Sequence, residues 1–222
     1  MTNTKVRSKV AIIALVLAGL IVAPAFALDT VIGETGIMLN GERQHVRTQE
    51  TNLGNLVTDM IRDYTGADIV MYNGGGIRAS AELGEITLEK AMEILAFNNE
   101  IVSLDMNGRQ IRAMLEHGVS SFPEVSGKFL QVSGLRFEFD PSRPAGQRVG
   151  DIFVGDNPLA PGRRYVVATN EFLAAGGDDY TMLADSPQIE LFEMTDQQAF
   201  IRYIQENSPL FPMVEGRIRI TR

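Results

Sequence analysis

The spacing of apolar residues predicts four helices along the chain. In residues 53–64 apolar side chains recur every three or four positions, and Gly66 follows as a typical helix end. Thr87 is a suitable N-cap for a second, shorter helix. A third helix is expected after the turn at Asn107-Gly108, and a fourth near the end of the chain. The segments with helical spacing are 53–64, 88–95, 111–119 and 196–207.

Short apolar or alternating segments predict strands between and after these helices. Residues 68–72 form a short apolar run, and residues 100–106 alternate between apolar and polar side chains as a half-buried strand does. The other expected strands are 31–39, 129–140, 149–154 and 165–170. Because helices concentrate early in the chain and strands late, we expect an α+β fold, a single mixed α/β domain, rather than a doubly wound parallel sheet.

The first 27 residues have the pattern of a secretory signal peptide. Lys5, Arg7 and Lys9 precede an uncharged run of 14 residues, and the small-residue pattern Ala25-Phe26-Ala27 follows it. An uncleaved membrane anchor is the alternative, but a spanning helix needs about 20 apolar residues. We expect cleavage after Ala27, which leaves one domain, residues 28–222, periplasmic or secreted and free of the membrane. Since the signal begins at Met1, we expect no other domain to precede it.

Composition excludes several classes of protein. The chain of 222 residues has no Cys, so a disulfide scaffold, an iron–sulfur cluster and thiolate zinc are excluded. The formal net charge is −8, and removal of the signal peptide takes away three basic residues and no acidic one. Such an acidic chain is a poor match to a nucleic-acid-binding protein, which needs clustered Lys and Arg.

Three polar or glycine-rich segments stand at the ends of predicted elements. The segment RTQETNLGNL, residues 47–56, opens the first helix, and its simplest interpretation is capping by Thr51 or Asn52. The segment NGGGIR, residues 73–78, is a tight turn whose three glycines cost conformational entropy and allow backbone amides to approach a ligand. The segment FLAAGGDDY, residues 172–180, can be a surface turn with solvated carboxylates. Taken together, the three segments favour a ligand cleft.

The side chains in and near these segments suit a nucleoside-like ligand. Phe97 and Phe172 lie at element ends, where aromatic rings can stack on a flat base. Asp178 offers acceptors for two sugar hydroxyls, and Asn73 offers both a donor and an acceptor. Two arginines bring the positive charge that an anionic substituent requires: Arg47 and Arg78.

Five motifs in order carry a resemblance to a known family. VIGETGIMLNGER, VRTQETNLGNLVTD, NGGGIR, FLQVSGL and FLAAGGDDY resemble the C-terminal domain of the 5′-nucleotidase and UDP-sugar hydrolase family, over roughly residues 30–216. In that family this domain holds the nucleoside part of the substrate, with the base stacked between two Phe. The resemblance therefore implies a fold of the 5′-nucleotidase C-terminal type and a nucleoside or nucleotide ligand.

The resemblance also implies roles for individual residues. Phe97 and Phe172 resemble the stacking pair, although Phe97 could equally cap the core beside Leu95. Asp179 is expected to be solvated. The other implied contacts are Asn73 and Asn99 to the base, Asp178 to the ribose hydroxyls, Arg47 and Arg78 to the ribose and phosphate side, and Gly75 and Gly177 in the glycine-rich segments.

Hydrolysis in that family belongs to an N-terminal metallophosphoesterase domain, whose motifs are missing from this sequence. A two-metal phosphatase needs several His, Asp and Asn ligands, in motifs such as Gly-Asn-His-Asp/Glu and His-x-His. The only histidines here, His45 and His117, are isolated, and we interpret them as a strand-edge side chain and a helix-end residue. We therefore expect no catalytic residue, no metal ligand and no cofactor in this chain, with metal ions only where a partner catalytic chain supplies their site.

Three functions remain open. The first is an exported nucleoside- or nucleotide-binding module. The second is a subunit of a 5′-nucleotidase-type hydrolase in nucleotide catabolism, completed in trans by a metallophosphoesterase chain. The third is an interaction or scaffold domain whose cleft has lost its ligand. Retention of the ligand-type residues favours the first.

Overall fold

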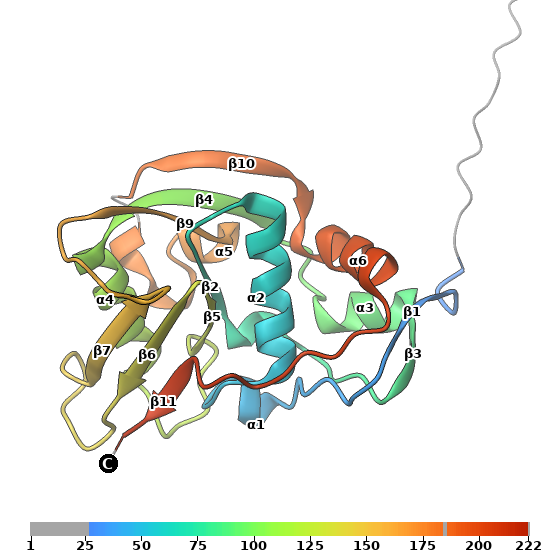
Figure 1. The fold of residues 1–222 in the computed structure, drawn as a ribbon, viewed down its shortest axis with the longest axis horizontal. Helices are drawn as coiled ribbons and strands as arrows, with labels where there is room; N and C mark the ends of the chain where they lie inside the picture. Colours follow the sequence, from blue (N-terminus) through green and yellow to red (C-terminus); the bar gives the residue numbers. More distant parts are fainter. Residues whose placement is uncertain (1–26, 184–185, 222) are drawn as a thin grey trace, which may run out of the picture.

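A five-stranded sheet forms the centre of the protein. The computed structural model describes residues 27–183 and 186–221. The strand order is β10-β4-β9-β2-β5, and all neighbours are antiparallel except β2 and β9 (Figure 1). The strands are β2 (Ile69–Asn73), β4 (Glu100–Asn107), β5 (Leu130–Ser133), β9 (Arg164–Asn170) and β10 (Gln188–Thr195).

Helices pack on both faces of this sheet and create two hydrophobic cores. Val70 and Tyr72 of β2 belong to the core beneath α2, α3 and α6, whereas Ile69 and Met71 belong to the core shared with α4. Because β2 is buried on both faces, it reads as a continuous apolar run. The helices are α2 (Asn52–Thr65), α3 (Leu88–Ile94), α4 (Gly108–Gly118) and α6 (Asp196–Asn207).

Two smaller sheets complete the fold. The first has the order β11-β6-β7-β8, and the second pairs β1 with β3. Their strands are β1 (Val31–Thr35), β3 (Gly84–Thr87), β6 (Leu135–Phe139), β7 (Val149–Val154), β8 (Asn157–Pro158) and β11 (Ile218–Ile220). The short helices are α1 (Arg43–Val46), α5 (Glu171–Ala174) and the 3₁₀ turns η1 (Gly74–Gly76), η2 (Gly177–Asp179) and η3 (Thr181–Leu183). The expectation of a mixed α/β fold is confirmed.

The four predicted helices are present, and local capping explains their bounds. Thr51 accepts a hydrogen bond of 3.0 Å from the amide of Gly54, so it is the N-cap of α2. Asn52 has a different role, because its side chain bonds the backbone of Met38 and Asn40. Gly66 ends α2 in the left-handed conformation with φ of 66°.

Two predicted strands are shorter than expected. The strand expected over 31–39 ends at Thr35, whose hydroxyl donates to the carbonyl of Ile37 and bends the chain. The strand expected over 129–140 is divided by Gly134, which has φ of +76° and lies too close to the carbonyl of Asp68 for a side chain. As a result, β5 joins the central sheet and β6 joins another.

The expected signal peptide, residues 1–27, lies outside the described residues except for Ala27. Over the described ranges, none of the helices combines the length and the apolar character that crossing a bilayer requires.

Candidate functional site

One cavity of about 400 Å³ brings together all the predicted site residues except Gly177. Its walls come from segments that lie far apart in the sequence but meet at one end of the central sheet. The lining residues are Arg47, Asn73, Gly75, Gly76, Arg78, Phe97, Asn99, Gly127, Phe172 and Asp178.

The three glycines after β2 form a closely packed turn, and two of them, Gly75 and Gly76, line this cavity. A Cβ on Gly74 would lie 2.0 Å from the carbonyl oxygen of Val46, and one on Gly76 would meet the ring of Tyr72. The expectation that these amides are free for a ligand is wrong for two of them. The amides of Gly74 and Gly75 donate to the carbonyls of Phe129 and Gly127, because the turn must close against that neighbouring segment.

A chain of polar side chains fixes Asn73 at the end of β2. Asn170 donates through Nδ2 to Oδ1 of Asn73 at 2.9 Å, and Asn73 donates through Nδ2 to Oδ2 of Asp178 at 2.9 Å. The bond between Asn170 and Asn73 is buried, whereas the bond between Asn73 and Asp178 is partly buried, at the cavity. The amide of Asn73 keeps one N–H and its oxygen one lone pair for a ligand.

Two phenylalanine rings stand exposed at the cavity. Phe97 is 60% exposed and Phe172 is 45% exposed, whereas Leu95 is 1% exposed. The core-capping alternative for Phe97 is therefore wrong, since its ring lies outside the core that buries Leu95. The guanidinium carbon of Arg78 lies 5.3 Å from the centroid of the Phe97 ring.

Gly177 does not line the cavity, and its part in the site is indirect. A Cβ at Gly177 would lie 2.5 Å from Cε2 and Cζ of Phe172. Only a glycine therefore lets the Phe172 ring lie against this turn. The neighbouring Asp179 is exposed, as expected.

Arg47 is the buried charge of the site. It is only 7% exposed, and its Nε has no hydrogen-bond partner. Burial, with the positive charges of Arg43 and Arg78, lowers the pKa of Arg47, and the charge of Asp178 opposes this shift. An anionic group next to Arg47 would satisfy the unpartnered donor and offset the repulsion between the arginines.

Comparisons with known proteins identify the fold. The family model of the 5′-nucleotidase C-terminal domain matches residues 31–185. The chain belongs to this family.

Relatives of this 5′-nucleotidase C-terminal domain are longer proteins. The trifunctional nucleotide phosphoesterase protein YfkN of Bacillus subtilis is 36% identical over 198 residues, which cover 85% of this chain and 14% of YfkN. Protein UshA of Escherichia coli is 33% identical over 183 residues, or 82% of this chain and 32% of UshA. The crystal structure of a 5′-nucleotidase precursor from Thermus thermophilus has a TM-score of 0.82 and 42% identity, with 86% of this chain and 39% of that chain covered. The chain thus spans 14–39% of these three proteins.

In this 5′-nucleotidase C-terminal domain, a buried acid lies behind Asn99. The carboxylate oxygen Oδ2 of Asp196 accepts bonds from Tyr72 Oη at 2.8 Å and Asn99 Nδ2 at 3.3 Å, and Oδ1 has no partner. Burial raises the pKa of Asp196, and the hydrogen bonds from Tyr72 and Asn99 partly offset that rise. The backbone amide of Asp196 also donates to the carbonyl of Asn99, so α6 is tied directly to the cavity wall.

Sequence patterns missed Gly127, which lines the cavity, and the contact of His117 with Asp178, although His117 is outside the lining. Gly127 lines it without any local signal other than its place just before the motif FLQVSGL. His117 does lie at the end of α4 as expected, but its Nε2 contacts the backbone oxygen of Asp178 at 2.8 Å. His45 lies in α1 rather than at a strand edge, and its Nδ1 contacts the side chain of Asn40.

Among the residues in the ranges 27–183 and 186–221, no group of three or more His, Asp or Glu side chains is arranged to hold a metal ion.

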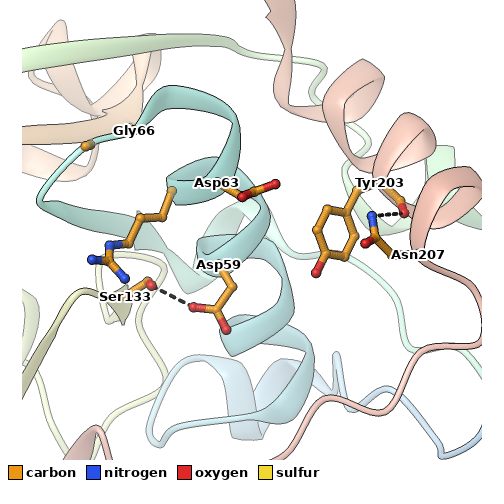
Figure 2. Close-up of a pocket in the computed structure, with 8 residues that line it drawn as sticks. Asp59, Asp63, Gly66, Ser133, Tyr203 and Asn207 are labelled. Atoms are coloured by element: carbon orange, nitrogen blue, oxygen red, sulfur yellow. Dashed lines mark hydrogen bonds between the residues drawn. The ribbon is translucent and has the colours of Figure 1, made fainter.

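A second and larger cavity, of about 570 Å³, lies between α2, α6 and β5 (Figure 2). Its central acid, Asp59, is already satisfied: Ser133 donates to Oδ1 at 2.6 Å, and Arg217 bonds both carboxylate oxygens at 2.8 and 2.7 Å. Asn207 likewise donates to the carbonyl of Tyr203. Asp59 thus ties α2 to β5 and to the C-terminal segment, whereas the bond of Asn207 stays within α6. The aromatic residue that lines this cavity, Tyr203, is partly buried, unlike the exposed Phe97 and Phe172 of the first one.

Proposed function

We propose that this domain is an exported nucleoside- or nucleotide-binding module that acts in the periplasm or outside the cell. The observation that supports this proposal is the lining of one cavity. Two exposed phenylalanine rings, a carboxylate and a buried arginine whose Nε has no hydrogen-bond partner all line it. Membership of the 5′-nucleotidase C-terminal domain family supports a nucleotide-related ligand.

The proposed ligand lies with its base between Phe97 and Phe172. Stacking of a base on an aromatic ring contributes about 1–3 kcal/mol and tolerates different bases. Asn73 and Asn99 bond the edge of the base. The carboxylate of Asp178 accepts from the two ribose hydroxyls, which are vicinal donors.

The arginines take the anionic side of the ligand. Arg47 and Arg78 lie on the same cavity, and a phosphate there would accept charge-assisted hydrogen bonds from both. In a protein with a formal net charge of −8, this local positive charge is what lets an anion approach.

Isothermal titration calorimetry with adenosine, AMP and UDP-glucose tests the proposal. We expect binding by the purified chain, and no heat of binding at millimolar ligand would refute it. Phe172→Ala and Asp178→Ala should each weaken binding. Matched controls are Phe211→Ala, an exposed phenylalanine outside the cavity, and Asp179→Asn, which removes the charge of the exposed neighbour of Asp178 and keeps a side chain that tolerates its positive φ. Both controls should bind like the wild type.

A second function has support from the lengths of the relatives. This chain spans 14–39% of the three proteins compared, so the rest of each of those proteins has room for a catalytic domain. In this second function, a separate metallophosphoesterase chain supplies that catalytic domain in trans. This candidate predicts metal-dependent release of phosphate from AMP only when the partner chain is present. Phosphate release by the purified chain alone, abolished by a chelator, would contradict it.

A further inference from the structure

The loop that carries Asp178 has an unusual backbone. Asp178 has φ of 52° and Asp179 has φ of 64°, so two successive residues other than glycine adopt the left-handed conformation. Such residues are strained and persist only where the surrounding structure holds them. The loop therefore needs contacts from outside to keep the carboxylate of Asp178 at the cavity.

One of these contacts is made by His117, from the last turn of α4. Its Nε2 lies 2.8 Å from the backbone oxygen of Asp178. A carbonyl oxygen only accepts, so Nε2 must carry the hydrogen. Nε2 carries a hydrogen both in one of the neutral tautomers and in the cation. The bond therefore forms whether or not Nδ1 is also protonated.

Tyr180 makes a further contact, and its ring packs against that of His117. The ring centroids of His117 and Tyr180 lie 4.6 Å apart in an edge-to-face arrangement. Tyr180 is fully buried and donates from its hydroxyl to the carbonyl of Lys128 at 2.6 Å. The adjacent Gly127 lines the cavity, and a Cβ there would be 3.4 Å from Oδ2 of Asp178. His117 and Tyr180 thus hold the backbone of the loop, whereas the bond from Asn73 holds the carboxylate itself.

We propose that His117 is a positioning residue for the ligand: by donating to the backbone carbonyl of Asp178, it holds that residue in the left-handed conformation that places its carboxylate at the cavity. This inference rests on the proposed function, in which Asp178 binds the ribose hydroxyls. A residue that only packed the end of α4 would affect every ligand equally.

Two variants and two ligands separate these roles. His117→Leu removes the donor, whereas in His117→Gln the side-chain amide can donate from about the position of Nε2. Adenosine depends on Asp178 through its hydroxyls, and 2′,3′-dideoxyadenosine lacks them. We expect His117→Leu to weaken adenosine binding roughly tenfold, the effect of one lost hydrogen bond, and to leave dideoxyadenosine within about threefold of the wild type. His117→Gln should restore adenosine binding.

The matched control is His45→Leu, because His45 is the second histidine and contacts Asn40 rather than this loop. Its ratio of adenosine to dideoxyadenosine affinity should equal that of the wild type. An equal loss of affinity for adenosine and dideoxyadenosine in His117→Leu would overturn the positioning role. Failure of His117→Gln to restore the wild-type ratio of the two affinities would overturn it as well. Absence of binding by the wild type would instead refute the proposed function.

Nuclear magnetic resonance of the ligand-free protein supplies a readout that needs no nucleoside. We expect a protonated, hydrogen-bonded Nε2 on His117. The backbone amide resonances of Asp179 and Tyr180 should shift in His117→Leu and return toward the wild type in His117→Gln. An unprotonated Nε2, or equal shifts in both variants, would refute the inference whatever the chain binds.

Discussion

Asn73 and Asp178 lie 105 positions apart in the sequence, and Nδ2 of Asn73 donates a hydrogen bond of 2.9 Å to Oδ2 of Asp178. This bond joins the end of strand β2, in the five-stranded sheet, to the loop after α5. One oxygen of the carboxylate is therefore oriented before any ligand arrives. Preorganisation of this kind reduces the entropy that binding costs.

The first prediction is that these two side chains act as a unit. Asn73→Ala and Asp178→Ala should each weaken adenosine binding, and the double variant should lose less than the two separate losses together. The loss of binding free energy in the double variant should be smaller than the sum of the two single losses by about 0.5–3 kcal/mol, the range for residues in one hydrogen-bond network. Titration calorimetry on the four proteins measures it. The pair Asn73→Ala and Asp179→Asn is the control, and it should be additive, because Asn tolerates the positive φ of residue 179. Additivity of Asn73 with Asp178 would contradict the coupling.

The second prediction concerns the buried charge of Arg47. In Arg47→Met, AMP affinity should fall roughly 10–100-fold because a charge-assisted bond to phosphate is lost, and adenosine affinity should fall much less. The melting temperature should stay the same or rise, since a buried and partly unpartnered guanidinium has been removed. Arg43→Gln, which changes an exposed arginine nearby, is the control. Equal loss of AMP and adenosine would count against an anion at Arg47.

The third prediction is a dependence of stability on pH through Asp196. Burial raises the pKa of Asp196 in the folded protein above its value in the unfolded chain. The stability that protonated Asp196 contributes is therefore fully present below the pKa of the unfolded chain, and it is lost as the pH rises through the pKa of the folded protein. Asp196→Asn keeps an acceptor for Tyr72 but does not titrate. Between about pH 4 and pH 8, the melting temperature of the wild type should therefore fall relative to that of Asp196→Asn. Asp151→Asn, an exposed site on β7, is the control. A change in the opposite direction would refute the assignment.

The fourth prediction distinguishes two glycines. A Cβ on Gly127 would stand 3.4 Å from Oδ2 of Asp178, which is an ordinary contact, so Gly127→Ala should melt like the wild type but weaken nucleoside binding by narrowing the cavity. A Cβ on Gly74 would stand 2.0 Å from the carbonyl oxygen of Val46, so Gly74→Ala should lose at least about 1–3 kcal/mol of stability. Circular dichroism melts and calorimetry check both. Stable Gly74→Ala, or unchanged binding by Gly127→Ala, would contradict the packing described.

Much of the fold could be predicted because its signals are local. The helix α2 has a Thr cap, apolar side chains at helical spacing and a left-handed Gly66, and all three are visible in the sequence. The division of residues 129–140 was not predictable in this way. It depends on the carbonyl of Asp68 lying next to Gly134, which is a contact between distant segments. The edge strand β10 was also missed, because its side chains are mostly exposed and lack a buried face.

The site was predictable to a similar extent. Residue types and motif order pointed to the side chains that do meet at the cavity, but exposure decided between the two interpretations of Phe97. The amides of Gly74 and Gly75 looked available in the sequence, and only tertiary packing shows that Phe129 and Gly127 accept from them. The contact of His117 with Asp178 joins residues 61 positions apart, so a single histidine on a helix gave no sign of it.

Strand β2 has a consequence for how this protein tolerates change. Its successive residues belong to opposite cores, so neither core can loosen without displacing Asn73 at the end of the strand. Substitutions far from the cavity, on either side of the sheet, will therefore register as altered affinity. By thermodynamic linkage, a bound ligand stabilises both cores at once. A loss of packing in either core would then lower the affinity for the ligand. Conversely, a saturating ligand would raise the free energy of unfolding of variants destabilised in either core.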